Sequence, residues 1–120
     1  MRQLTFAEIQ PLVRGCSHVS QVEQRIAFDR IGPAGRAYYA QNDNWALRTR
    51  CPAGVVLDML TDASRIAIAG AIFGGARRWA YVDAVIDGSL VATIGTDQIG
   101  SELAGQLLLP PAAQPRRVSV

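Results

Sequence analysis

The residues best suited to covalent chemistry are a serine and a histidine, but their order argues against a hydrolytic centre. Ser89 lies in Asp87-Gly88-Ser89-Leu90, which holds the letters of a Gly-Asp-Ser-Leu nucleophile motif in the wrong order. A serine nucleophile needs a base to accept its proton, normally a histidine oriented by a carboxylate. His18 is the only histidine, it precedes every candidate nucleophile, and Gly15 stands where an aspartate would be needed. We therefore predict no catalytic residues and a structural or solvated His18.

Other catalytic and ligand-binding patterns are also missing. Asp83 and Asp87 are four residues apart, which on a strand means roughly 13 Å, too far for a glycosidase pair. The glycine-rich stretches lack the Lys-Ser/Thr of a phosphate loop. Cys16 and Cys51 belong to no Cys-x-x-Cys or Cys/His cluster, which argues against zinc. We expect no metal and no cofactor, and we favour two small buried thiols over a disulfide.

Aromatic side chains are the remaining candidates for ligand binding. The flat apolar faces of sugars stack on aromatic rings, so exposed tryptophan and tyrosine side chains would form a saccharide platform. The competing interpretation is that these side chains pack in the core or against a neighbouring domain, where they bury large areas. We favour packing and keep saccharide binding as the alternative. Its candidate residues are Tyr39, Trp45, Trp79 and Tyr81, and Arg77-Arg78 beside Trp79 indicate that Trp79 is exposed.

Length and composition fit one domain over residues 1–120. Hydrophobic residues make up 49% and charged residues 18%, which is enough for a core without metal or disulfide. The net charge is only +2 and the arginines are scattered, whereas nucleic-acid-binding proteins usually concentrate basic residues. No apolar run approaches the roughly 18 residues of a membrane span, and no secretory signal is visible. We expect a cytoplasmic chain that binds neither nucleic acid nor membrane.

From residue 12 onward the sequence is typical of short β-strands. Apolar residues alternate or form short runs between glycine, proline, asparagine and aspartate. Roughly eight such segments, about ten residues apart, predict an all-β antiparallel sandwich or jelly roll. Helices long enough for the crossovers of a parallel sheet are missing. Strands are expected at 19–22, 25–31, 55–59, 66–72, 79–86, 89–94, 107–109 and 118–120.

Three connections carry specific signals. Asp87-Gly88 predicts a type I′ hairpin, because both central residues of that turn need positive φ. Gly32-Pro33-Ala34-Gly35 is expected to form a turn, since proline fixes φ and glycine supplies positive φ. Gln41-Asn42-Asp43-Asn44 is expected to be a polar break.

Weaker signals predict helical turns and one irregularity. Thr5-Phe6-Ala7-Glu8 has the form of a capping box, and Pro11 limits that helix to about one turn. Gly70 suggests a bulge or a close backbone approach inside its strand. Residues 97–104 are expected to form a loop or a helical turn.

Two longer stretches resemble a known family. Residues 53–64 (AGVVLDMLTDAS) are similar to an "aGvrL.f.TDs" block in the N-terminal domain of certain GDSL/SGNH-type hydrolases. Residues 81–91 (YVDAVIDGSLV) are similar to the "DvvvDG.lv" hairpin of the same domain. The similarity spans about residues 12–120 and is looser in the first half. In this family the domain is a jelly-roll β-sandwich, like that of carbohydrate esterase family two, and it precedes an α/β/α catalytic domain.

The resemblance implies an accessory role. The catalytic Ser, Asp and His of the family belong to the second domain, so no position here inherits them. We therefore expect the non-catalytic N-terminal domain of an esterase or lipase, which packs on and supports a catalytic SGNH domain of the same polypeptide. The alternative is a domain like a carbohydrate-binding module that recognises a saccharide. A third interpretation is self-association as a homodimer, because a domain without its partner exposes an apolar patch.

Overall fold

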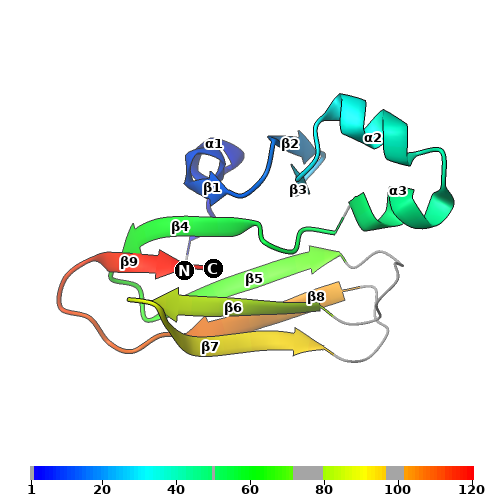
Figure 1. Cartoon of the computed structure of the whole chain (residues 1–120). Coiled ribbons are helices and arrows are strands. Elements are labelled where there is room, and N and C mark those ends of the chain that lie inside the picture. The colour runs from blue at the N-terminus through cyan, green and yellow to red at the C-terminus, as the bar shows by residue number, and fades with distance from the viewer. Residues whose placement is uncertain (1, 50, 72–79, 97–101) are drawn as a thin grey trace. The chain divides into compact units, whose positions relative to one another are not determined.

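The computed structural model describes residues 2–49, 51–71, 80–96 and 102–120 (Figure 1). Just under half of these residues lie in antiparallel strands, and the α-helices among them are only four to seven residues long. The predicted all-β class is therefore confirmed. The chain divides into two compact units, Met1–Leu57 and Asp58–Val120. No helix within the described residues is long and apolar enough to cross a membrane.

The first unit begins with the predicted capping box. Helix α1 (Phe6–Ile9) is capped by Thr5, whose side chain accepts from the Glu8 backbone while the Glu8 carboxylate accepts from the Thr5 backbone N–H. A 3-10 turn, η1 (Gln10–Leu12), follows, with Pro11 in its first turn. Proline supplies no N–H to the helix, so α1 stays at about one turn, as predicted.

The capping box makes α1 sensitive to pH. The Thr5 backbone N–H, then the Arg2 guanidinium and the Thr5 hydroxyl, lower the pKa of Glu8 from 4.5 to about 2. A lowered pKa stabilises the folded state above about pH 4.5, and this contribution is lost as pH falls toward 2. In Glu8→Ala at pH 7, we expect hydrogen exchange of the Ile9 amide, which donates to the Thr5 carbonyl, to be several-fold faster than in the unsubstituted chain. The difference should shrink steadily below pH 4.5, and a difference that is constant down to pH 2 would contradict the capping role.

Short strands follow in the first unit. β1 (Val13–Arg14) pairs with the first two residues of β4 (Val56–Thr61). β2 (His18–Val22) and β3 (Arg25–Asp29) form an antiparallel hairpin with an uninterrupted register. The strands expected at 19–22 and 25–31 are thus present and adjacent, although the second ends at Asp29.

The turn predicted at Gly32-Pro33-Ala34-Gly35 is wrong, because helix α2 (Pro33–Tyr39) begins there with Gly32 as its N-cap. Proline at the first helical position is favourable, since its fixed φ suits a helix and its missing N–H has no intrahelical partner anyway. Helix α3 (Asp43–Thr49) begins inside the expected polar break, of which only Gln41 and Asn42 lie outside the helix. The Asn42 side chain accepts from the backbone N–H groups of Asn44 and Trp45 and so caps α3.

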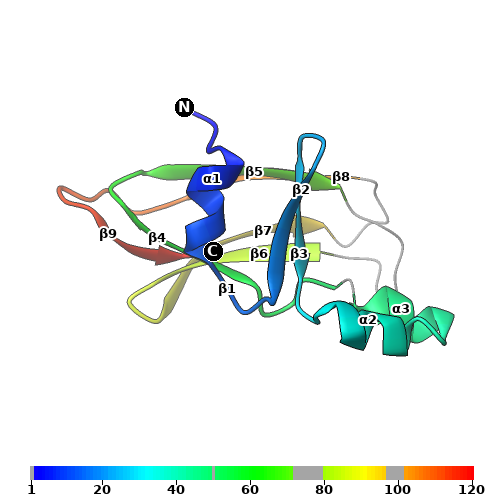
Figure 2. The same cartoon turned by 90° about the horizontal axis from the view of Figure 1, so that it is seen from above.

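The second unit is a sandwich of two antiparallel sheets (Figures 1 and 2). One sheet contains the rest of β4, then β9 (Arg116–Ser119), β6 (Ala80–Ile86) and β7 (Ser89–Thr96) in that order. The other contains β5 (Arg65–Ala71) and β8 (Glu102–Leu108). Residues 102–104 therefore belong to a strand and not to the expected loop or helical turn, and residues 97–101 lie outside the described part.

The core of this unit lies between the two sheets. Leu107 on β8 and Val118 on β9 are fully buried, and Ala84 and Leu109 complete the buried cluster. Side chains from both sheets pack against it, mostly at alternating positions as the period of a β-strand requires; the adjacent Val91 and Ala92 lie at a shift in the β6–β7 register. The side chains that pack against the cluster are Met59, Ile66, Ile68, Val82, Ile86, Val91, Ala92, Ile94 and Val120.

The β6–β7 connection confirms the predicted hairpin. Asp87 has φ +50° and Gly88 has φ +77°, the pair of positive values that a type I′ turn needs. The predicted bulge or close approach at Gly70 is wrong, because Gly70 pairs with Leu103 in an unbroken register and a Cβ there would meet no atom within 4 Å. The irregularity lies instead between Ala84 and Val85, two residues before the turn. Ile72, Gly74 and Gly75, expected at the end of β5, lie outside the described residues.

Candidate functional site

Ser89 and His18, the candidate nucleophile and base, do not form a catalytic arrangement within either unit. His18 begins β2 in the first unit, with an exposed side chain. Ser89 begins β7 in the second unit and is also exposed. The second unit has no histidine, so Ser89 has no histidine base within its own unit.

The carboxylates have structural partners. Asp83 accepts a hydrogen bond of 2.7 Å from the Thr93 hydroxyl across the β6–β7 pair. Asp58 accepts from the Arg117 guanidinium and the Ser119 hydroxyl, and thereby links β4 to β9. The hydrogen bond to Asp58 raises the pKa of Arg117 above its usual range.

The cysteines are both free thiols. Cys51 is exposed and Cys16 is half-buried, so the expectation of two buried thiols is wrong. No group of three or more His, Cys, Asp and Glu side chains in the described part of the chain could hold a metal ion.

Two of the four predicted aromatic residues come together. Tyr39 ends α2 and Trp45 lies in α3, and their rings meet edge to face with centroids 6.1 Å apart. Tyr38 meets Tyr39 in the same way at 5.2 Å. Tyr81 is exposed on β6 in the second unit, and Trp79 lies outside the described residues. The only part of the predicted platform that is seen to come together among the described residues is therefore the Tyr39–Trp45 pair in the first unit.

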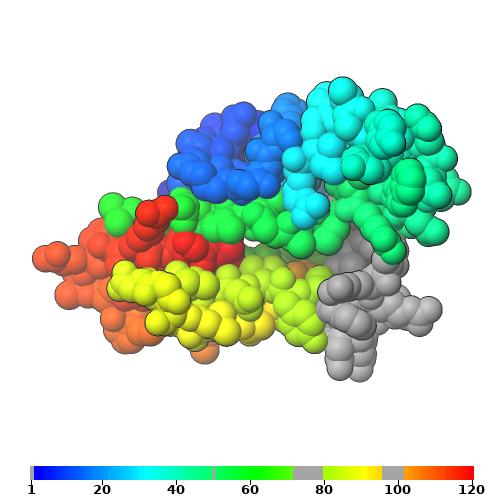
Figure 3. Space-filling view, viewed as in Figure 1, coloured from blue at the N-terminus to red at the C-terminus, as the bar shows by residue number. Residues whose placement is uncertain are grey.

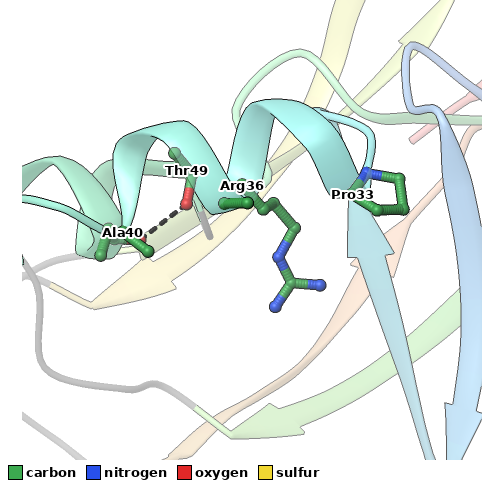
Figure 4. A pocket seen from close by; sticks show the side chains of 6 residues that line it. Pro33, Arg36, Ala40 and Thr49 are labelled. Carbon is green, nitrogen blue, oxygen red and sulfur yellow. Dashed lines mark hydrogen bonds between the residues drawn. The ribbon is translucent and has the colours of Figure 1, made fainter.

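The two helices enclose two shallow hollows. α2 and α3 lie side by side in both views, and their exposed surface is visible as the cyan to green segment of Figure 3. The larger hollow, about 350 Å³, is shown in Figure 4. Four of its six lining residues are Pro33 and three alanines, and its one arginine, Arg36, is paired with Asp29 at 3.0 Å. The Thr49 hydroxyl, its other polar side-chain group, donates to the Ala46 carbonyl. The larger hollow therefore presents few polar groups that could recognise a ligand.

The smaller hollow has an almost entirely apolar surface. It measures about 160 Å³ and is lined by aromatic and aliphatic side chains and by the apolar stems of two arginines. Its two arginines, Arg30 and Arg48, have no ion pair within the described residues, and no carboxylate lines it. We call it the Trp45 hollow; its lining consists of Arg30, Ile31, Tyr39, Trp45, Arg48 and Thr49.

Sequence reasoning found the aromatic residues of the Trp45 hollow but missed its arginines. A helical period over 43–49 would have found one of them, since Trp45, Arg48 and Thr49 are spaced i, i+3, i+4 and so share a helix face. Arg30 gives no such signal, because it follows β3 and reaches the hollow only through the packing of the unit.

Comparison of the chain with protein families, with curated proteins and with solved structures found no match. A function for this protein therefore has to be argued from its residues and their geometry.

Proposed function

We propose that this chain is the non-catalytic N-terminal domain of a GDSL/SGNH-type esterase or lipase, a jelly-roll sandwich that packs on and supports a catalytic domain of the same polypeptide. The observation that carries the proposal is where the two family-like stretches fall. Residues 58–64 of the first stretch form most of β4 and the turn before β5, and residues 81–91 form the β6–β7 hairpin. Residues 58–64 and 81–91 belong to the sandwich unit, whereas residues 53–57 of the first stretch belong to the other unit.

The outer face of the larger sheet also supports an accessory role. Opposite the core, Leu60 on β4, Tyr81 on β6 and Leu90 on β7 are exposed large apolar side chains. Met59 and Val82 are the sequence neighbours of Leu60 and Tyr81, and Ile86 lies near Leu90 in the register of the two strands. Met59, Val82 and Ile86 point into the core, so the three exposed side chains point away from it. Arg117 and Asp83 lie on the same face, so it combines apolar and charged side chains, as surfaces between the domains of one chain do.

A hydrolysis assay tests the proposal. The purified chain should release p-nitrophenolate from p-nitrophenyl acetate no faster than the same chain after heat denaturation, because Ser89 has no histidine base in its unit. The gene sequence flanking this region should encode a Gly-Asp-Ser motif and, farther on, an Asp-x-x-His motif. Hydrolysis above the denatured control that disappears in Ser89→Ala would overturn the non-catalytic role. Flanking sequence without the two motifs would overturn the link to this family.

A second candidate function is saccharide recognition, and the Tyr39–Trp45 pair favours it. Both side chains are exposed to at least a third of their area and both line the Trp45 hollow. Tryptophan and tyrosine combine a large apolar face with a polar group, which suits the mixed surface of a sugar ring.

A further inference from the structure

We propose that this chain forms a two-fold dimer through the outer edge of strand β5, which pairs antiparallel with β5 of a second copy. β5 and β8 make up the smaller sheet of the second unit, and β8 is the only strand paired with β5 among the described residues. The backbone N–H and C=O groups on the other side of β5 therefore have no strand partner within that part of the chain. Such a dimer requires neither the esterase assignment nor saccharide recognition.

β5 lacks the features that usually keep a sheet edge from pairing with another chain. Proteins protect such edges with bulges, proline, lysine or very short strands. β7, the edge strand of the larger sheet, has a bulge at Val91, where the β6–β7 register shifts. β5 has seven residues, no proline or lysine, and an unbroken register. β8, its partner, packs against β7, so β5 is the unprotected outer strand of this sheet.

The side chains of two β5 strands match when the two-fold axis passes through Ile68. All seven residues of β5 are then paired, and Ile66 lies opposite Gly70 of the second copy. Ala67 lies opposite Ala69 in the same way. Because successive side chains point to opposite faces, the isoleucines of both copies lie on the core side and the alanines on the outer side. Ile66 and Ile68 are only half-buried although they pack on the core, so surface remains for contact with the second copy.

The same register places opposite charges near each other at both ends of the interface. Arg65 lies opposite Ala71 of the second copy, and Ala71 pairs with Glu102 on β8. Arg65 and Glu102 of the second copy are then two strand spacings apart, about 10 Å between their backbones. Only the methyl group of an alanine lies between them, and an arginine and a glutamate side chain together span this distance. The two-fold axis makes the ion pair occur twice.

Both charged side chains are available for this contact. Arg65 and Glu102 are exposed, and neither forms an ion pair within the described residues. The Arg65 guanidinium donates a 3.3 Å hydrogen bond to Gln106 Oε1, which places it over the outer face of the sheet, the face on which Glu102 also lies. In the dimer the guanidinium exchanges this neutral contact for a stronger, charge-assisted one.

Sedimentation velocity of the whole chain tests the dimer and its ion pairs. Between low micromolar and near-millimolar concentration, the average mass should rise from one chain toward two, because one strand pair makes a small and therefore weak interface. Arg65→Glu puts a carboxylate beside Glu102 and should raise the dissociation constant about tenfold, since the change acts twice in the dimer. Glu102→Arg should have the same effect. The double variant Arg65→Glu, Glu102→Arg should dimerise as the unsubstituted chain does.

Arg25→Glu is the matched control. It changes the net charge by the same amount at an exposed arginine of β3 in the other unit, and it should leave dimerisation unchanged. Circular dichroism of each variant checks that the fold is kept. Equal weakening in Arg25→Glu and Arg65→Glu, or no recovery in the double variant, would overturn the register centred on Ile68. A mass that stays at one chain, or that exceeds two, would overturn the two-fold dimer.

Hydrogen exchange identifies the strand at the interface. Alternate amides of an antiparallel strand point to opposite neighbours, so the β5 amides that do not donate to β8 point toward the proposed second copy. These amides should exchange several-fold more slowly at near-millimolar than at low micromolar concentration. The amides of the bulged edge strand β7 should exchange at the same rate at both concentrations. Slower exchange confined to β7 or β8 would overturn β5 as the interface.

Discussion

Replacing Leu107 by alanine is expected to lower the free energy of unfolding by about 3 kcal/mol, within the range of roughly 2–5 kcal/mol for buried leucines. Leu107 lies on β8 with none of its surface exposed, and it packs in the buried cluster between the two sheets of the second unit. Its truncation removes buried apolar surface and leaves a cavity that neighbouring side chains fill only in part. Urea titration followed by far-ultraviolet circular dichroism measures the loss.

The neighbouring residue provides the control. Leu108 belongs to the same strand, but 65% of its surface is exposed because successive side chains point to opposite faces. Leu108→Ala removes the same atoms from the other face and should change the free energy of unfolding by less than about 0.5 kcal/mol. If Leu108→Ala cost as much as Leu107→Ala, the assignment of faces in β8 would be wrong.

This pair of leucines also shows what a sequence can and cannot predict. The run of residues 107–109 predicts a strand near that position, and β8 is there. The run is apolar at each position, so its alternation is hidden and the buried face cannot be chosen from it. The choice comes from pairing with β5, where Leu107 is opposite Ile66, a residue that packs on the core.

The helices α2 and α3 were missed for a related reason. Each is seven residues long, too short for a helical period to become clear, and Gly32-Pro33 reads equally well as a turn or as a helix start. The Asp87-Gly88 hairpin, by contrast, was predictable because a type I′ turn places a chemical demand on two adjacent residues.

The candidate site was predictable only in its residue types. Aromatic residues were identified as a group, but the fold decides which of them meet: Tyr39 and Trp45 share a helical pair, whereas Tyr81 belongs to the other unit. Arg30 and Arg48 are eighteen residues apart in the sequence and share a hollow only because the segment between them folds as two packed helices.

A second large loss of stability is expected for Gly15→Ala. Gly15 follows β1 with φ +79°, a left-handed conformation that costs an L-residue roughly 1–2 kcal/mol. An added Cβ would also lie 2.3 Å from the Gly54 carbonyl oxygen. That oxygen belongs to the backbone and cannot rotate away, so relief of the clash requires β1 and the chain before β4 to separate. The expected loss is about 3 kcal/mol, measured by the same urea titration.

Gly54→Ala separates the two contributions to that loss. Gly54 has φ +86°, but an added Cβ there would meet no atom within 4 Å, so this variant carries the conformational cost alone, roughly 1–2 kcal/mol. The excess loss of Gly15→Ala over Gly54→Ala then measures how firmly the β1–β4 pair resists separation. Equal losses would mean that two residue pairs, Val13 with Leu57 and Arg14 with Val56, are too few to hold β1 against the clash. A larger loss in Gly15→Ala would mean that this short pairing is a rigid part of the first unit.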